Sequence, residues 1–266
     1  MPAPPVCPAC GSPYLKKFGA GTQRVEAELR NLLADRPEVR IVRMDADTTS
    51  TRDAHVRLLD EFAHPGAAVL LGTQMIAKGL DFDDVVLVGV IDADTQLRLP
   101  DFRSAERTFD LVEQVAGRAG RGAFEGRVLV QTYMPESCAI QAAAAYDRRR
   151  FLADELPKRK LLGYPPYVRL VNILVWGDKV EEVREVAIGL SERIEKIIRD
   201  VAGEGWTSLG AAPCAIDKLR GSHRWHILIK APVDADIAAA IAPAIRGRRA
   251  HKRVNVACDV DPLSLL

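Results

Sequence analysis

Short, nearly continuous apolar runs alternate with helical patterns in the first half of the chain, and this alternation constrains the fold strongly. Residues 39–44, 67–71, 85–91 and 127–131 predict four β-strands. Their apolar character is typical of strands that are covered on both faces. Because helical patterns separate them, the segment predicts an α/β fold with a parallel sheet and right-handed crossovers.

Three amphipathic segments predict the intervening helices, at residues 22–34, 53–62 and 103–119. Thr22 is suited to cap the first helix, and Pro37 follows the end of that helix. Residues 138–162 predict a further helical segment, which the string Gly163-Tyr164-Pro165-Pro166 closes because proline cannot continue a helix.

The rest of the chain has a different element order. Strands are predicted at residues 168–176, 208–216, 224–230 and 253–260, and helices at 180–202 and 235–245. The order is therefore strand, helix, strand, strand, helix, strand. This order is typical of the ferredoxin-like α+β fold.

Charge and composition exclude some classes of protein. Among 266 residues, 37 Lys and Arg nearly balance 36 Asp and Glu, so any site for a polyanion must be local. The longest apolar run, residues 85–91, is too short to span a bilayer. The 5 cysteines do not form a disulfide framework, which favours a reducing, cytoplasmic location.

The string Gln114-Val115-Ala116-Gly117-Arg118-Ala119-Gly120-Arg121 predicts a polyphosphate site. Two arginines provide permanently charged, planar groups that match phosphate oxygens, and the glycines leave room for close approach. Gln114 and Arg118 are expected to share one helix face. The alternative is a helix of small residues that packs on the sheet and exposes its arginines to solvent.

A second polar string, residues 72–82, follows a predicted strand. Thr73 can donate to a phosphate, Gly79 permits close approach to a ribose, and Asp81 can accept from a sugar hydroxyl. The alternative is an ordinary turn with a capping threonine. Because Thr73 and the pair Asp92 and Asp94 each follow a strand, we expect them at the carboxyl edge of the sheet.

Several strings together resemble one protein family. They are Gly-Thr-Gln-Met-Ile-Ala-Lys-Gly-Leu-Asp-Phe (72–82), Asp-Phe-Arg-Ser-Ala-Glu-Arg (101–107), Gln-Val-Ala-Gly-Arg-Ala-Gly-Arg (114–121), Arg-Met-Asp-Ala-Asp-Thr-Thr (43–49) and Asp-Val-Asp-Pro-Leu (259–263). They resemble the PriA family, the bacterial primosomal replication-restart DNA helicases of superfamily 2. The resemblance covers essentially the whole chain.

The resemblance implies four segments. Residues 1–13 would be the remnant of a Cys-rich zinc region, 14–135 a RecA-like second helicase lobe, 136–166 a helical connector, and 167–266 a C-terminal α+β domain. The implied activity is an ATP-dependent 3′ to 5′ DNA helicase that assembles the primosome and restarts replication at stalled forks.

Site residues are carried over by motif. The implied catalytic residues are Gln114, Arg118 and Arg121, which act with Gly117 in motif VI. Gly79 and Asp81 of motif V would contact nucleotide, and Thr73 would grip the DNA backbone. ATP with Mg²⁺ is the implied cofactor, shared with a first lobe, and the arginines would neutralise charge on the transferring phosphoryl group.

The chain lacks the Gly-x-x-x-x-Gly-Lys-Ser/Thr phosphate loop and a sequence that would hold Mg²⁺. We therefore expect this chain alone to have no ATPase activity. The alternative from another class is a non-catalytic DNA- or partner-binding module derived from such a helicase. Whether a nucleotide binds distinguishes the two.

Cys7 and Cys10 have the spacing of half a zinc site. The resemblance implies zinc in the full-length family, but structural zinc takes four ligands, and a lone pair holds the metal weakly. Zinc binding by this chain is therefore doubtful.

The C-terminal domain has cations near an aromatic residue. Candidate DNA-binding residues are Arg224, Trp225, Arg248, Arg249 and Lys252. The alternative is a solvated loop and a core tryptophan. The resemblance implies branched and single-stranded DNA, primosome proteins and single-stranded-DNA-binding protein as partners, and no membrane.

Overall fold

The computed structural model describes residues 21–45, 47–49, 51–73, 76, 82, 84–120, 125–202, 204–246 and 253–265. The chain forms two compact units. The first unit contains the described residues up to Arg98 together with Glu106–Asp147. The second unit contains Leu99–Ala105 and Arg148–Leu266.

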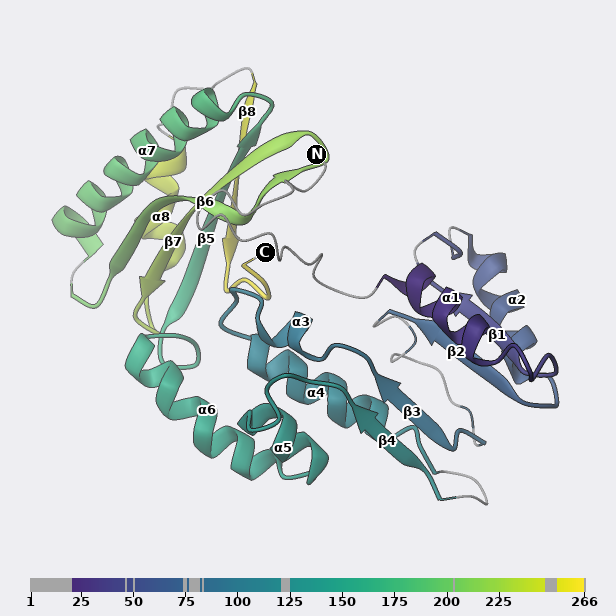
Figure 1. Cartoon of the computed structure of the whole chain (residues 1–266). Helices are drawn as coiled ribbons and strands as arrows, with labels where there is room; N and C mark the ends of the chain where they lie inside the picture. Colours follow the sequence, from purple (N-terminus) through teal and green to yellow (C-terminus); the bar gives the residue numbers. More distant parts are fainter. Residues whose placement is uncertain are drawn as a thin grey trace, which may run out of the picture. The chain divides into compact units, whose positions relative to one another are not determined.

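One pair of strands in the first unit is flanked by two helices. Strand β1 (Arg40–Met44) pairs in parallel with β2 (Ala68–Gly72). Helices α1 (Thr22–Leu32) and α2 (Arg52–Ala63) contact this pair, as Figure 1 shows. The predicted strands and helices are therefore present, with ends that differ by a few residues.

A second strand pair in the first unit carries the helix that leads to the candidate arginine. Strand β3 (Leu87–Val90) pairs in parallel with β4 (Arg127–Val130). Helix α4 (Ser104–Ala116) contributes Phe109 and Val112 to the core, which are 0% and 1% exposed. The parallel pairing is confirmed, but the described strands form two pairs and not one continuous sheet.

The prediction that these strands are covered on both faces is wrong for β3 and β4. Leu87 and Leu129 are 56% and 63% exposed, and burial alternates along both strands. An apolar run alone does not distinguish a strand with two covered faces from one that presents alternate residues to solvent.

Three local predictions need correction. Thr22 does not cap α1, because the helix begins at Thr22 with Gly21 in the capping position. A short helix, α3 (Asp94–Leu97), was not predicted. The expected single helix at 138–162 is two helices, α5 (Cys138–Ala144) and α6 (Arg148–Leu162), because Tyr146 between them has a left-handed backbone with φ 52°.

The second unit has the predicted ferredoxin-like order. Its elements are β5 (Arg169–Gly177), α7 (Val180–Ile197) with a final π turn (Ile198–Ala202), β6 (Thr207–Leu219), β7 (Ser222–Ala231), α8 (Ile237–Arg246) and β8 (Val254–Val260). The sheet is antiparallel with order β6-β7-β5-β8. This topology confirms the predicted α+β fold.

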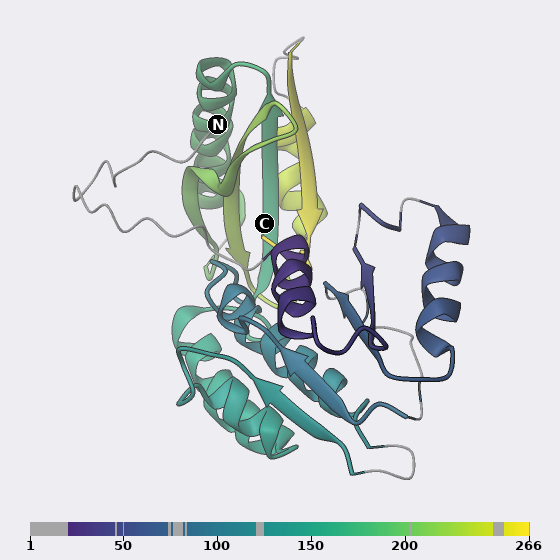
Figure 2. The same cartoon turned by 45° about the vertical axis from the view of Figure 1, so that its right-hand side comes forward.

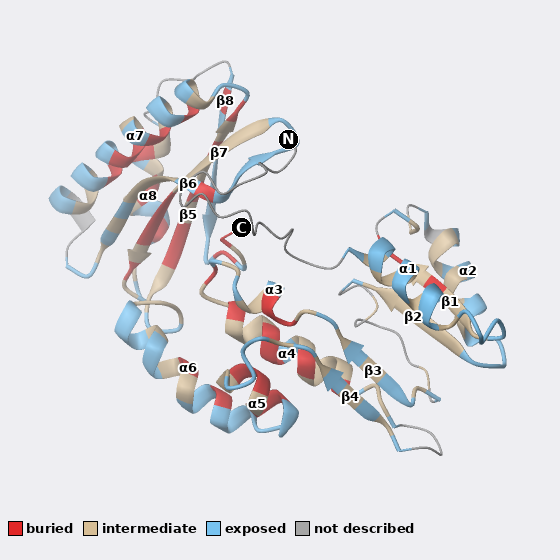
Figure 3. Ribbon diagram, viewed as in Figure 1, coloured by how far each residue is buried: buried red, intermediate tan, exposed pale blue. Residues whose placement is uncertain are grey.

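Helices α7 and α8 cover the same face of this sheet (Figures 1 and 2). The core between them contains Val171, Ile173, Leu190, Ile194, Ile227, Ile229, Ile237 and Ile241. Figure 3 shows the resulting buried band along β5, β7 and α7. None of the described helices is both long enough and apolar enough to cross a membrane.

Candidate functional site

The candidate arginine Arg118 lies in a turn immediately after α4. The amide of Arg118 donates to Val115 O at 3.1 Å, and that of Gly117 donates to Glu113 O at 3.0 Å. Because α4 ends at Ala116, Arg118 does not continue the helix face of Gln114 as predicted. Both side chains are partly buried.

The turn that carries Arg118 is held against the strands. Gly120 has φ 78° and donates its amide to Val85 O at 3.0 Å. A Cβ at Gly126 would lie 2.7 Å from Ala119 Cβ and would overlap the backbone of the same turn. Glycine at both positions is therefore required, at Gly120 by the positive φ and at Gly126 by the close approach. The small residues of the motif fix the position of Arg118.

Arg118 lies at the amino ends of β3 and β4. Arg127, the first residue of β4, donates its amide to Val86 O at 2.9 Å beside the Gly120 contact. At the other end, Ala93 donates to Gln131 O at 3.1 Å, so Asp92 and Asp94 lie at the carboxyl ends. The general rule that ligands gather at carboxyl ends therefore does not locate this arginine.

Thr73 directly follows β2 and is exposed. Its carbonyl accepts from the amide of Ile76 at 3.1 Å, which turns the chain at the strand end. A Cβ at Gly72 would lie 2.7 Å from Ile76 Cγ2 and would overlap the Met44 carbonyl of the paired strand. Gly72 thereby fixes the direction in which the backbone carries Thr73.

Several candidate residues lie outside the described residues. They are Cys7, Cys10, Gly79, Asp81, Arg121, Arg248, Arg249 and Lys252. Their roles, and zinc binding by the cysteine pair, stay predictions. Within the part of the chain that the structure describes, no group of three or more His, Cys, Asp or Glu side chains is placed to hold a metal ion.

Asp45 is a buried carboxylate that the sequence analysis gave no role. Its Oδ2 accepts from Thr22 Oγ1 at 2.6 Å, and its Oδ1 accepts from the amides of Asp47 and Thr48 at 3.1 Å each. These hydrogen bonds, led by that from Thr22, and the nearby Arg43 hold the pKa of Asp45 below its usual value. Asp45 therefore joins the start of α1 to the end of β1.

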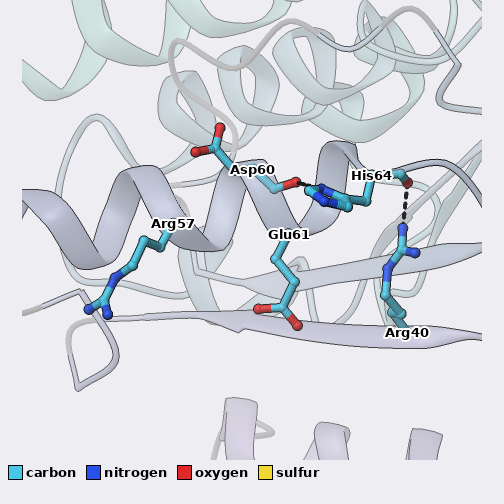
Figure 4. A pocket seen from close by; sticks show the side chains of 5 residues that line it. All are labelled: Arg40, Arg57, Asp60, Glu61 and His64. Atoms are coloured by element: carbon cyan, nitrogen blue, oxygen red, sulfur yellow. Dashed lines mark hydrogen bonds between the residues drawn. The ribbon is translucent and has the colours of Figure 1, made fainter.

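A shallow pocket lies beside α2 and β1 (Figure 4). It is lined by Arg40, Arg57, Asp60, Glu61 and His64. Arg40 is already used, because its Nη1 donates to Pro65 O at 3.0 Å and its Nη2 donates to His64 O. The mixed charges and this engaged arginine do not suit a polyanion.

In the second unit, Trp225 packs against Val175 and Val183 on the side of the sheet that α7 covers. This position agrees with the alternative of a core tryptophan. Arg224 is the neighbouring residue on β7, so its side chain points to the opposite face of the sheet. Burial and the positive charge of Arg224 lower the pKa of His226, which lies on that face.

Comparison with known proteins gives two domain matches. A family model described as the helicase conserved C-terminal domain matches residues 18–123. A model described as the primosomal protein N C-terminal domain matches residues 160–263. The first match contains Thr73, Gln114 and Arg118, and the second contains the ferredoxin-like sheet.

Curated relatives carry the same family name along the whole chain. Replication restart protein PriA of Bacillus subtilis (strain 168) is 40% identical over 268 residues, which cover 100% of this chain and 32% of that protein. The chain belongs to the PriA family. PriA of Synechocystis sp. is 41% identical over 263 residues, covering 98% of this chain and 30% of that protein. PriA of Treponema pallidum is 38% identical over 266 residues, covering 99% and 39%.

The chain thus spans about a third of the length of these PriA relatives, for example 32% of the Bacillus subtilis protein. The two domain matches correspond to the C-terminal portion of the PriA family. The RecA-like lobe predicted for the first half is confirmed as a helicase C-terminal domain.

Proposed function

We propose that this chain forms the second motor lobe and the C-terminal domain of an ATP-dependent 3′ to 5′ DNA helicase that restarts replication at stalled forks. The family membership supports a role in replication restart. The turn that carries Arg118 supports the motor role. Its amide contact to Val85 and its close approach to Gly126 hold an arginine where the backbone is tightly constrained.

Arg118 acts electrostatically in this proposal. Phosphoryl transfer spreads negative charge over the transferring group, and a positioned guanidinium stabilises that charge without changing its own protonation. Gln114 is one helical turn before Arg118 and is also partly buried. ATP and Mg²⁺ would be held mainly by another lobe, so the residues of this chain complete the site and do not build it alone.

Substitution of Arg118 tests the motor role directly. The chain is supplied with the first motor lobe of a PriA relative, and DNA-stimulated ATP hydrolysis is measured for wild type and Arg118→Ala. We expect Arg118→Ala to lower kcat by at least about a hundredfold, in keeping with the loss of a catalytic arginine. Binding to single-stranded DNA should change by less than about twofold, because Arg118 does not contact DNA in this proposal.

Arg57→Ala is a matched control, because Arg57 is an exposed arginine of the same unit that lies on α2. It should keep full activity. Unchanged turnover in Arg118→Ala would contradict the proposal. ATP hydrolysis by the purified chain without the first lobe would contradict the statement that another lobe holds the nucleotide.

A further inference from the structure

The loop before α4 is part of the second unit, although α4 continues into the first. Leu99–Ala105 group with Arg148–Leu266, whereas Glu106–Asp147 group with the first unit. Asp101 is 9% exposed and anchors this loop. Its Oδ2 accepts from the Leu265 amide at 2.9 Å and from Ser264 Oγ at 3.2 Å. Its Oδ1 accepts from the Arg103 amide at 2.8 Å. One carboxylate thereby holds the loop to the C-terminal residues.

An aromatic stack makes the second attachment. The rings of Phe102 and Tyr164 are parallel within 1°, with centroids 5.3 Å apart. The Arg159 guanidinium lies 5.6 Å from the centroid of Phe102, and Lys230 Nζ lies 4.4 Å from that of Tyr164. Both rings also pack against a cluster of Leu170, Leu228 and Leu265. The loop is therefore held by packing as well as by hydrogen bonds.

Helix α4 connects this loop to the candidate catalytic turn. It begins at Ser104, whose Oγ donates to Asp101 O at 2.8 Å. It then runs for 13 residues, a length of about 20 Å. Phe109, Val112 and Ala116 bury one face of the helix. A packed helix does not bend freely, so a displacement at its first turn is transmitted to its last.

We propose that Asp101 and Phe102 are positioning residues, through which the second unit sets the position of Arg118. This inference rests on the proposed function and adds a means of regulation to it. DNA that binds the second unit would shift the Asp101 loop and, through α4, the guanidinium. A misplacement of about 1 Å lowers the rate of a reaction strongly, but it need not alter nucleotide affinity. The coupling therefore acts on kcat for ATP and not on KM.

A double-mutant cycle across the stack tests the coupling. Steady-state ATP hydrolysis with single-stranded DNA is measured for Phe102→Leu, Tyr164→Leu and the double variant, each supplied with the first lobe. Each single change should lower kcat by about tenfold and leave KM for ATP within about twofold. The double variant should be no slower than the slower single variant, because both changes break the same contact. Phe102→Tyr, which keeps a ring at the site, should restore kcat.

Tyr167→Leu is the matched control. Tyr167 is an aromatic residue of the same unit that is 39% exposed and lies near Lys160. It should leave kcat unchanged. Unchanged kcat in both stack variants, or losses that multiply in the double variant, would overturn the proposal. So would a loss in Tyr167→Leu equal to that in Phe102→Leu.

Hydrogen exchange in the chain itself gives a readout without ATP. The amides of Gly117, Arg118 and Gly120 should exchange faster in Phe102→Leu and in Tyr164→Leu than in wild type. The amides of β5 should keep their protection, which shows that the second unit stays folded. Unchanged exchange at the Arg118 turn would overturn the coupling even if the reconstituted enzyme were inactive. Conversely, if Arg118→Ala abolishes hydrolysis but the stack variants do not affect it, only the coupling fails.

Discussion

Thr22 Oγ1 donates a hydrogen bond of 2.6 Å to Asp45 Oδ2. This bond joins the first residue of α1 to the residue after β1, and Asp45 is only 5% exposed. The carboxylate also accepts backbone amides from the turn that follows it, so its charged form is favoured in the folded chain. The stability of this part of the first unit should therefore depend on pH.

Asp45→Asn should reveal this dependence. The pKa of Asp45 is lower in the folded chain than its model value of 3.8, so its contribution is complete above that value and is lost as pH falls through the folded pKa. The melting temperature of wild type should exceed that of Asp45→Asn near neutral pH. The difference should shrink between about pH 5 and about pH 2. A difference that is constant over this range would contradict the assignment.

Gly72→Ala should destabilise the first unit by about 1–3 kcal/mol, because the added methyl group overlaps the Met44 carbonyl and Ile76. Gly89→Ala is the matched control. Gly89 also lies in a strand, β3, but nothing lies within 4 Å of its Cβ position, so the free energy of unfolding should change little. Denaturant unfolding of both variants measures the difference. Equal effects would show that strand propensity decides, and not the close approach.

Arg40→Met should destabilise the first unit by about 1–2 kcal/mol, because the carbonyl groups of His64 and Pro65 lose a charged donor. These carbonyls lie at the end of α2, where the helix has no donors of its own. Thermal unfolding compares this variant with Arg57→Met, a change in the same pocket at an exposed residue. Arg57→Met should be close to wild type, and an equal loss in both variants would contradict the capping role.

Trp225→Ala should lower the stability of the second unit by about 2 kcal/mol, because its ring packs against Val175 and Val183. Trp225→Phe should recover most of this loss. DNA affinity, measured by fluorescence anisotropy with a fork substrate, should follow stability for these two variants. Arg224→Ala should weaken DNA binding without lowering the melting temperature, because Arg224 lies on the other face of β7. Tighter dependence of DNA affinity on Trp225 than on Arg224 would restore the stacking role first predicted for the tryptophan.

Local patterns were sufficient for much of the fold. The apolar runs predicted β1 and β2, and the element order of the second half predicted the β6-β7-β5-β8 sheet. Both depend on hydrophobic periodicity and turn residues, which are properties of short segments. The motif around Arg118 was likewise visible in the sequence, because guanidinium groups beside glycines carry a chemical meaning at any position in a fold.

Only the tertiary structure decided which contacts these segments make. Thr22 could have capped α1, but its hydroxyl binds Asp45, a residue distant in the sequence. Trp225 stood among cations in the sequence, yet packing against Val183 places its ring in the core. The loop at Asp101 lies between elements of the first unit along the chain and belongs to the second in space. Each of these outcomes is set by hydrogen bonds and packing between residues far apart in the chain, and their free energies do not appear in any local pattern.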